Sequence, residues 1–383
     1  MNGLAAETAS RSDRQVLSLF SGAGGLDLGF EAIGFKPTLA LDIDPAAVET
    51  YNHNRKDRGR VAHVADLASM SSEEVINRWE TARGETVGPI GFVGGPPCQA
   101  FSESNVHPLN DDPRAMLPLA YADLLRAFNE RYGHSLRFFA FENVAGLSYR
   151  PHASSLSEIL ARFRDAGFEQ VEPFMLDALN FGVPQRRRRM FIVGLHPWDA
   201  GHRFAAPTGD PCTRLTVRQA IGGLVQPVPF ARGRNPADLG LHPNHWHMNP
   251  KSEKFRSGKN EPGHHLGRSF RMLHWDEPSQ TIAFGHREVA VHPDGHRRLS
   301  VLEAMFLQGF PSSYVLCGTL TDQIRLVSDA VPPPLGRALA AEIARVLDVS
   351  DAVGTQEQPS DNGQAPHNGL VDLQTSAPKS TKA

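Results

Sequence analysis

The amino-acid sequence predicts an α/β fold, with a mixed sheet covered by helices on both faces and a smaller, loop-rich second domain. Between residues 16 and 194, short apolar runs alternate with helical patterns, which is typical of a parallel sheet whose strands are joined by helices. From 198 to about 297 proline, glycine and histidine accumulate and the helical periodicity fades. A less regular domain is therefore expected after the sheet.

Seven apolar runs have the length and composition of strands. In chain order they are 16–20, 37–43, 60–64, 89–95, 137–144, 168–176 and 190–195. Only a loop separates the last two runs, which favours a hairpin that closes the sheet. Regular pattern returns at 299–310, and 331–349 carries Ala, Leu and Ile at helical spacing after a proline start. We expect this last helix to pack on the first domain.

These patterns divide the chain into five segments. They are a polar arm at 1–13, a first domain at 14–197, a second domain at 198–297, a return segment at 298–349 that completes the first domain, and a tail at 350–383. The arm and the tail contain few bulky apolar residues. We expect both to be disordered, because burial there cannot offset the entropy of ordering.

Composition limits the class of protein. The 383 residues include 39 Lys and Arg against 42 Asp and Glu, so any contact with nucleic acid must come from a local basic patch. Three widely separated cysteines argue against a disulfide framework or a zinc knuckle and favour a cytoplasmic location. No apolar run reaches the roughly 18 residues of a membrane span, and no signal-peptide core is present. We expect no membrane partner.

A glycine-rich turn follows the first strand, in LFSGAGGLDLGF. Glycines such as Gly22 and Gly24 let a ligand approach the backbone closely, at the strand ends where α/β sheets bind ligands. Asp27 stands where the dinucleotide fingerprint has its third glycine, so a ligand without phosphates is favoured. A glycine-rich turn with no ligand is the alternative.

Aspartates follow the next two strands. Asp42 stands about 20 residues after the glycine turn, the spacing at which a carboxylate reaches ribose hydroxyls. Asp66 follows the third strand and can accept a hydrogen bond from an adenine amino group, while Asp44 precedes Pro45 and is most simply a helix N-cap. Each of them alone is more often a cap or turn residue. Together, at successive strand ends, they predict a nucleoside pocket.

The fourth, fifth and last strands carry reactive or charged residues. A lone cysteine is usually a small buried hydrophobe, but the double proline before Cys98 and the polar sequence after it favour a nucleophile. Glu142, in FENV at the end of the fifth strand, is costly to bury unless it is paired or used, and is a candidate acid. In the run 186–189, alternate side chains of an extended segment share a face. Arg187 and Arg189 are therefore both available to an active site or a phosphate.

This ordered set closely resembles the DNA (cytosine-5)-methyltransferase family of bacterial or phage type. The resemblance covers roughly residues 15 to 348 and rests on FSGAGGLDLGFEAIGF, DIDPAAVETY, ADL, GGPPCQAFS, ENV, QRRRRMFIVG, RLSVLEAMFLQGFP and AVPPPLGRAL. It implies the Rossmann-like fold of S-adenosylmethionine-dependent methyltransferases, with a catalytic domain at 14–197 and a target recognition domain at 198–297. It also implies methyl transfer from S-adenosylmethionine to C5 of a cytosine flipped out of a short, specific duplex DNA sequence.

The resemblance implies four catalytic residues. Cys98 is similar to the nucleophile that adds to cytosine C6. The addition is needed because C5 is a poor nucleophile until it occurs. Glu142 is similar to the residue that contacts N3 and the exocyclic amine. Arg189 looks like the arginine at the base carbonyl, with Arg187 in support.

The resemblance also implies a set of cofactor-binding residues. They are Phe20, Gly22 and Gly24 at the methionine side, Asp42 at the ribose, Asp66 at the adenine, Pro97 in the same pocket, and Asp329. Ser328 and Asp329 stand where the family commonly has Gly-Asn. Aspartate can accept a hydrogen bond there but cannot donate one as an amide does.

Double-stranded DNA is the implied partner. Between 225 and 298, 11 Lys and Arg outnumber 7 Asp and Glu, so positive charge concentrates in the predicted target recognition domain. The same span holds 9 of the 17 His, including His264 and His265, but it lacks the cysteines and the regular spacing of a zinc site, so no metal is expected. We expect a monomer. A cognate restriction endonuclease acting separately, and the recognition sequence itself, leave no readable trace.

Two alternatives stay open. A branch of the same family methylates cytosine in transfer RNA, although its Cys-Phe-Thr segment is not found in the second domain. A catalytically silent DNA-binding regulator would keep the fold without the chemistry, although none of the expected reactive residues is missing.

Overall fold

The computed structural model describes most of the chain. The described residues are 14–97, 113–200, 203–212, 214–248, 250, 253–256, 271–282 and 290–354. The predicted nucleophile Cys98, the arm 1–13 and residues 355–383 of the tail lie outside them. Within them, no helix has both the length and the hydropathy that crossing a membrane requires.

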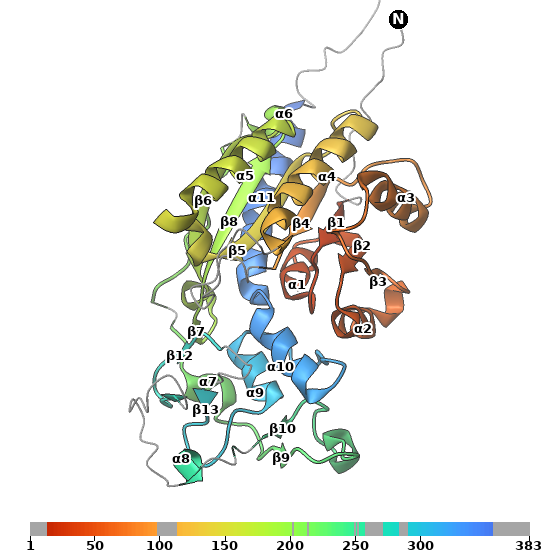
Figure 1. The fold of residues 1–383 in the computed structure, drawn as a ribbon. Coiled ribbons are helices and arrows are strands. Elements are labelled where there is room, and N and C mark those ends of the chain that lie inside the picture. The colour runs from red at the N-terminus through yellow and green to blue at the C-terminus, as the bar shows by residue number, and fades with distance from the viewer. Residues whose placement is uncertain are drawn as a thin grey trace, which may run out of the picture.

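A sheet of seven strands forms the centre of the upper part of the molecule in Figure 1. The strands are β1 (Gln15–Leu19), β2 (Lys36–Asp42), β3 (Ala62–Val64), β4 (Gly91–Gly94), β5 (Phe138–Val144), β6 (Glu169–Asp177) and β8 (Arg188–Leu195). Their order is β3-β2-β1-β4-β5-β8-β6. All seven apolar runs are strands as predicted, because each is a short apolar segment bounded by turn residues.

The sheet is mixed, because β8 runs antiparallel to both of its neighbours, β5 and β6. The other pairs are parallel. The hairpin expected at the end of the sheet is present as the β6–β8 pair, with β6 at the edge. The carboxyl ends of β1 to β5 therefore all meet at one edge of the sheet.

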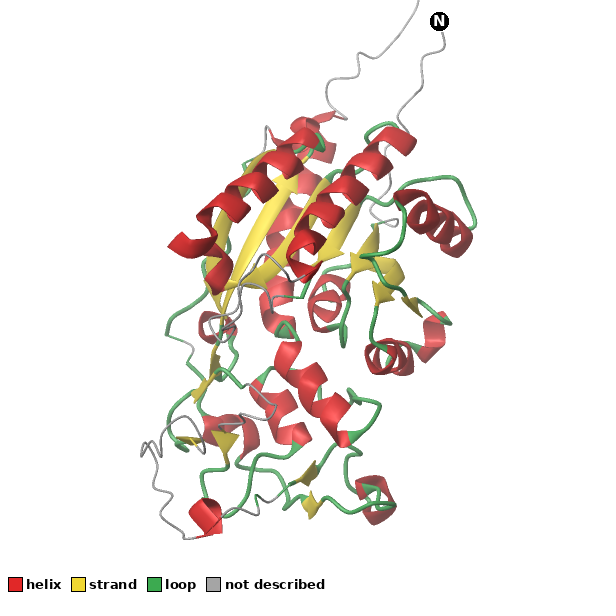
Figure 2. Ribbon diagram, viewed as in Figure 1, coloured by secondary structure: helices red, strands yellow, loops and turns green. Residues whose placement is uncertain are grey.

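Helices cover both faces of the sheet (Figure 2). They are α1 (Gly25–Glu31), α2 (Pro45–His53), α3 (Ser72–Arg83), α4 (Leu117–Arg131), α5 (Ala153–Asp165) and α11 (Pro333–Gly354). One core joins α3, α4 and α5 to the sheet through Trp79, Phe128 and Phe163, all fully buried. A second core joins α1 and α11 to the opposite face. The predicted fold class is confirmed.

The last helix packs on the first domain, as predicted. It crosses α1 so closely that a Cβ at Gly29 would lie 2.3 Å from the backbone nitrogen of Arg337. Only a glycine at this crossing lets the two backbones meet. In Figure 1, α11 runs behind the sheet, on the side away from α4 and α5.

The lower part of the molecule in Figure 1 is built from short elements. They are β7 (Gln185–Arg186), α7 (Val217–Ile221), β9 (Val228–Pro229), β10 (Trp246–His247), α8 (Glu253–Arg256), β11 (Arg271–Met272), β12 (Ser279–Gln280), β13 (Ala290–Val291), α9 (Val301–Leu307) and α10 (Leu320–Asp329). The short helix α6 (Pro197–Ala200) instead lies at the top of the molecule, next to α11. The 3-10 turns among the described residues are 56–58, 113–116, 145–148, 150–152, 178–181 and 236–239. A third core joins α7 and the short strands to α9 and α10. The division at 197 and 297 into catalytic and target recognition domains stays a prediction.

Candidate active site

The glycine-rich turn lies at the carboxyl end of β1. Three of its residues have left-handed backbone, with φ of 53° at Phe20, 52° at Gly22 and 76° at Gly24. A Cβ at Gly24 would lie 2.9 Å from the Tyr51 ring, whereas one at Gly22 would meet no atom within 4 Å. The side of the turn at Gly22 is therefore open, and a ligand can approach the backbone there.

Asp42, at the end of β2, holds this turn in place. Its carboxylate accepts hydrogen bonds from the backbone nitrogen of Gly22 at 2.7 Å and from that of Asp44 at 2.8 Å. Burial raises the pKa of Asp42, and the two backbone donors oppose the rise. Each carboxylate oxygen keeps capacity for a second hydrogen bond. The two predicted cofactor residues Gly22 and Asp42 are thus in direct contact.

Asp44 and Asp66 lie at the same edge. Asp44 caps α2 by accepting from the Ala46 nitrogen at 3.0 Å, as the sequence predicts, and its carboxylate also forms a 2.6 Å ion pair with Arg325 of α10. No local pattern predicts this pair, because Asp44 and Arg325 are 281 positions apart in the sequence. Asp66 is exposed beyond β3, and its carboxylate accepts from the Ala68 nitrogen at 3.0 Å.

A buried polar cluster supports the glycine turn from below. Tyr51 donates to the Asp27 carboxylate at 3.1 Å, and the Arg55 guanidinium stacks on the Tyr51 ring with its carbon 3.7 Å from the ring centre. Arg55 also forms a two-point ion pair with Glu31, at 2.8 and 2.9 Å. The hydroxyl of Tyr314 donates to the carbonyl of Ala23 inside the turn itself. This cluster fixes the turn, and no motif in the sequence predicts it.

Asp27 makes the stability of the protein depend on pH. Burial raises its pKa from 3.8 to about 6, and Arg55 opposes the rise. An acid whose pKa is raised on folding costs stability when ionised, so the cost is full above pH 6 and disappears as the pH falls through 6 toward 4. We expect Asp27→Asn, which can still accept from Tyr51, to be more stable at pH 8 by up to roughly 3 kcal/mol. Thermal melts from pH 4 to 8 measure the effect.

The gain of Asp27→Asn should shrink steadily as the pH falls. A variant that is less stable than the native protein at every pH would mean that the attraction between Asp27 and Arg55 outweighs the burial cost. A gain that does not change with pH would also contradict the account, because it could not come from ionisation.

Close packing ties the turn before Cys98 to the ends of β1 and β5. A Cβ at Gly94 would lie 1.8 Å from the Leu19 carbonyl oxygen, and one at Gly95 would lie 2.2 Å from the carbonyl oxygen of Glu142 and 2.9 Å from its Oε2. The buried amide of Asn143 donates to the carbonyl of Pro96 at 3.4 Å. The predicted pocket residue Pro97 follows and is exposed. The described residues that immediately precede Cys98 therefore pack next to Glu142.

Gly95→Ala should damage this contact. The added methyl group meets backbone atoms that cannot rotate away, so the turn must move; overpacking of this kind costs about 1–3 kcal/mol. A displacement near 1 Å at a reacting group lowers rates by about 10²-fold. We expect loss of activity of that order and a lower melting temperature.

Gly223→Ala is the matched control, because a Cβ at this exposed residue would meet nothing within 4 Å. Its activity and melting temperature should stay at the native values. Equal behaviour of the two variants would show that the glycine at 95 is not required for close packing.

Glu142 and Arg189 form a largely buried ion pair at this edge. Nε of Arg189 lies 2.9 Å from Oε1 of Glu142, and the two side chains are 12% and 14% exposed. The pair bridges β5 to β8, where Val144 lies opposite Arg189. Burial raises the pKa of Glu142, while Arg189 and Arg187 oppose the rise and Asp329 adds to it. A carboxyl of this kind can hold a proton more readily than an exposed one.

Arg187 lies on the same side of the strand as Arg189 but is fully buried. Arg186 and Arg188 are exposed, so the side chains alternate as the extended segment predicts. The guanidinium of Arg187 donates to the carbonyls of Ser328 at 2.6 Å and Ala330 at 2.9 Å. Arg187 therefore links the start of β8 to the end of α10, and its buried guanidinium is not accessible to a phosphate.

Asp329, the last residue of α10, completes the edge. Asp329 is exposed at the surface. Desolvation by the neighbouring protein atoms raises the pKa of its carboxyl, while Arg187 and Arg325 oppose the rise. Nearby, the hydroxyl of Ser21 is buried with no hydrogen-bond partner in the part of the chain that the structure describes. The edge thus offers polar groups that a ligand can satisfy.

The site is therefore assembled from strand ends that are far apart in the sequence. Direct contacts join Gly22 to Asp42 and Glu142 to Arg189. Phe20, Gly24 and Pro97 lie on the turns that border them. Asp66 is engaged in its own turn, and Cys98 lies outside the described residues.

Comparison with known proteins identifies the family. The sequence model of the family described as C-5 cytosine-specific DNA methylase matches residues 14–345. The chain belongs to the C-5 cytosine-specific DNA methylase family. Type II methyltransferase M.MthTI of Methanothermobacter thermautotrophicus is 31% identical over an alignment of 356 residues, and the match covers 87% of this chain and 98% of that protein. Type II methyltransferase M.FnuDI of Fusobacterium nucleatum is 29% identical and covers 87% of this chain and 95% of its own.

Solved structures share the fold of this methylase. A structure described as a DNA modification methyltransferase encoded within a prophage (E. coli) superposes with a TM-score of 0.70 at 21% identity, over 87% of this chain and 99% of that one. The Entamoeba histolytica methyltransferase EhMeth superposes with a TM-score of 0.61 at 16% identity, over 88% and 98% of the two chains. The predicted methyltransferase fold is confirmed.

The second part of the methylase gives no sign of a metal centre in its described portion. No group of three or more His, Cys, Asp or Glu is arranged there to hold an ion. His264 and His265 lie outside the described residues. His245 and His292 are buried, and His245 contacts the Ser300 hydroxyl at 3.0 Å and the Val225 carbonyl at 2.7 Å. These two histidines are packed in the interior.

Proposed function

We propose that this protein methylates C5 of a cytosine flipped out of a short, specific sequence in duplex DNA, through a covalent bond between Cys98 and C6. The observation that carries the proposal is the Glu142–Arg189 pair, at 2.9 Å, packed against the glycines that lead into Cys98. Membership of the methylase family supports the same reaction.

The residues have separate roles in the proposed reaction. The Cys98 thiolate adds to C6, which forms the carbon–sulfur bond and makes C5 nucleophilic. Glu142 hydrogen-bonds N3 and the exocyclic amine, and its raised pKa suits it to donate a proton as charge develops there. Arg189 contacts the base carbonyl and stabilises negative charge. Once C5 carries the methyl group, it gives up its proton to water. The electron pair of that C–H bond restores the C5–C6 double bond, and the C6–S bond breaks to release the thiolate.

The residues at the glycine turn fit S-adenosylmethionine. Bound at this edge, that cofactor supplies the electrophilic methyl group. Gly22 leaves open space over the turn, and Asp42 holds the turn while keeping acceptor capacity for ribose hydroxyls. The buried Ser21 hydroxyl and Asp329 offer further polar contacts. The proposed cofactor site is completed by Phe20, Gly24, Asp66 and Pro97. Arg187 holds the segment at Ser328, on the other side of this site, by donating to the Ser328 carbonyl.

Labelling tests the proposal directly. The protein is incubated with methyl-tritiated S-adenosylmethionine and mixed-sequence duplex DNA, with transfer RNA in a parallel reaction. We expect label in 5-methylcytosine of the DNA. Label only on adenine, or only on transfer RNA, would contradict the proposed substrate. Bisulfite sequencing of plasmid from an expressing host then gives the recognition sequence.

A further inference from the structure

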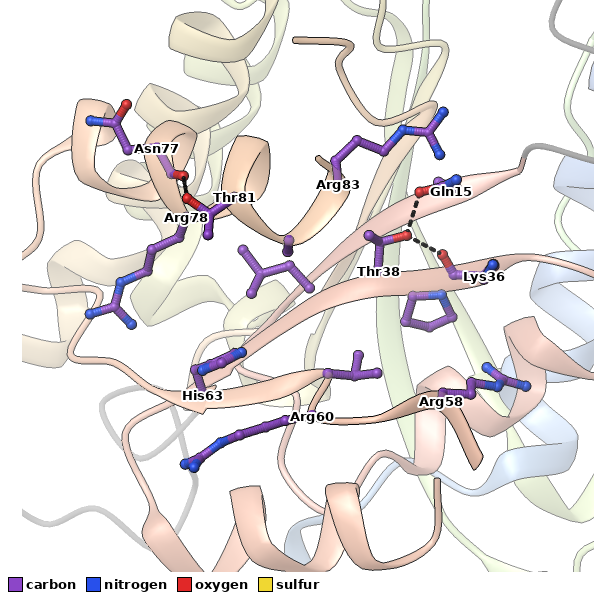
Figure 3. Close-up of a pocket in the computed structure, with 14 residues that line it drawn as sticks. Gln15, Lys36, Thr38, Arg58, Arg60, His63, Asn77, Arg78, Thr81 and Arg83 are labelled. Carbon is purple, nitrogen blue, oxygen red and sulfur yellow. Dashed lines mark hydrogen bonds between the residues drawn. The ribbon is translucent and has the colours of Figure 1, made fainter. Parts of the chain in front are cut away.

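A basic pocket lies on the side of the sheet away from the active-site edge. It has a volume of about 730 Å³ and is formed by the start of β1 and β2, the segment leading into β3, and the second half of α3 (Figure 3). Its lining residues are Gln15, Lys36, Pro37, Thr38, Leu39, Arg58, Arg60, Val61, His63, Asn77, Arg78, Thr81, Ala82 and Arg83. None of the functional residues described above is among them.

The basic pocket is strongly positive in a chain whose net charge is −3. Five of its 14 lining residues are Lys or Arg and none is Asp or Glu. Arg58 pairs with Glu31 at 2.8 Å and Arg83 with Glu85 at 3.3 Å. In the described part of the chain, no carboxylate lies within ion-pair distance of Lys36, Arg60 or Arg78, all of which are exposed. The positive charges of these three residues are therefore not compensated by ion pairs with the described residues.

The cations are spread along the basic pocket and do not converge on one point. Arg60, His63 and Arg78 lie at one end, and Lys36 and Arg83 lie at the other (Figure 3). Burial together with Arg60 and Arg78 lowers the pKa of His63, so this ring is neutral near pH 7 and leaves the charge to the arginines. Cations that are spread out in this way suit an extended polyanion such as a nucleic-acid backbone better than a single compact anion.

The basic pocket is separate from the active site. Lys36 begins β2 and Asp42 ends it, so the two lie roughly 20 Å apart at about 3.3 Å per residue. Because β1, β2 and β3 are parallel, their starts all lie at the edge opposite to the glycine turn. When the target cytosine of a duplex occupies the active site, the base pair it came from therefore does not lie at the basic pocket.

We propose that the basic pocket binds the phosphate backbone of a second segment of duplex DNA while the first segment occupies the active site. The inference rests on the proposed function, since it takes DNA as the substrate. A nucleotide is less well matched: no aromatic ring other than His63 lines the pocket to stack a base, and no glycine turn lines it to bring backbone N–H groups to a phosphate. Backbone contacts of this kind are independent of sequence and sensitive to salt. The second contact would let the methylase pass between DNA segments without full release.

A bridging assay tests the inference. A short duplex with one target site is fixed to beads, the protein is added, and a fluorescent non-target duplex is supplied after washing. We expect the native protein to retain the second duplex, and Lys36→Glu/Arg60→Glu to retain at least about fivefold less. The double variant should methylate a short duplex at a rate within about twofold of the native rate, because neither residue lies in the catalytic machinery. Each lost phosphate contact should also reduce the salt dependence of the capture.

Arg126→Glu/Arg162→Glu makes the same change in charge on α4 and α5, where the side chains are 51% and 43% exposed. This control should capture the second duplex as the native protein does. Equal loss in the control, or no loss in Lys36→Glu/Arg60→Glu, would overturn the inference. A native protein that methylates DNA but captures no second duplex would overturn it and leave the proposed function standing. Failure to methylate any DNA would instead refute the proposed function.

Discussion

Serine in place of Cys98 is expected to lower the rate of DNA methylation by about 10³-fold or more. A hydroxyl is almost fully protonated at neutral pH and is a far weaker nucleophile than a thiolate, so the addition at C6 that activates C5 is lost. The substitution changes one atom and leaves the double proline turn intact, so binding of duplex DNA and of S-adenosylmethionine should change little. Initial rates with tritiated cofactor, together with DNA binding by gel shift, separate the two effects.

Cys212→Ser is the matched control. Cys212 is free and exposed on the surface, so the same change of sulfur for oxygen there should leave the methylation rate at the native value. If Cys98→Ser also kept its rate, the covalent route through Cys98 would be wrong.

Glu142→Gln is expected to lower kcat by about 10²- to 10⁴-fold, which is the usual contribution of a general acid. Glutamine keeps the size of the side chain and one acceptor oxygen, but it cannot pass a proton to cytosine N3 and it loses the charge that pairs with Arg189. Because the pKa of Glu142 is raised, the native enzyme should lose activity as the pH rises through that pKa. The glutamine variant should lack this pH dependence.

Glu172→Gln, at an exposed position of β6, is the control for Glu142→Gln and should behave as native. A Glu142→Gln enzyme with native kcat and a native pH profile would remove Glu142 from the proposed chemistry. A change in KM alone would assign it to binding of the base and not to proton transfer.

The sheet could be predicted from the sequence because its strands are short apolar runs separated by clear turns. The same property located the active-site edge: in parallel strands the residues that follow each strand meet at one end, so Gly22, Asp42 and Glu142 could be expected together. Alternation along the extended segment also placed Arg187 and Arg189 on one side. In each case the signal is local in the sequence.

Contacts between distant segments could not be predicted in this way. The pairs Asp44–Arg325 and Arg187–Ser328 join the sheet edge to α10, and no local pattern indicates which helix returns there. Asp27 was identified only as a departure from a glycine fingerprint, although its burial beneath the turn gives it a distinct role. Likewise, α9 and α10 share one core with the loop-rich region, and the periodicity of the sequence does not predict that these segments pack together.

Trapping with a duplex that carries 5-fluorocytosine at the target position is the most direct test of the central claim. Fluorine at C5 cannot leave as a proton does, so the reaction should stop with the protein bonded to C6. We predict a covalent protein–DNA adduct that requires S-adenosylmethionine, maps by peptide mass spectrometry to Cys98, and is absent in Cys98→Ser. An adduct on another residue, or methyl transfer by the native protein with no adduct at all, would contradict the account.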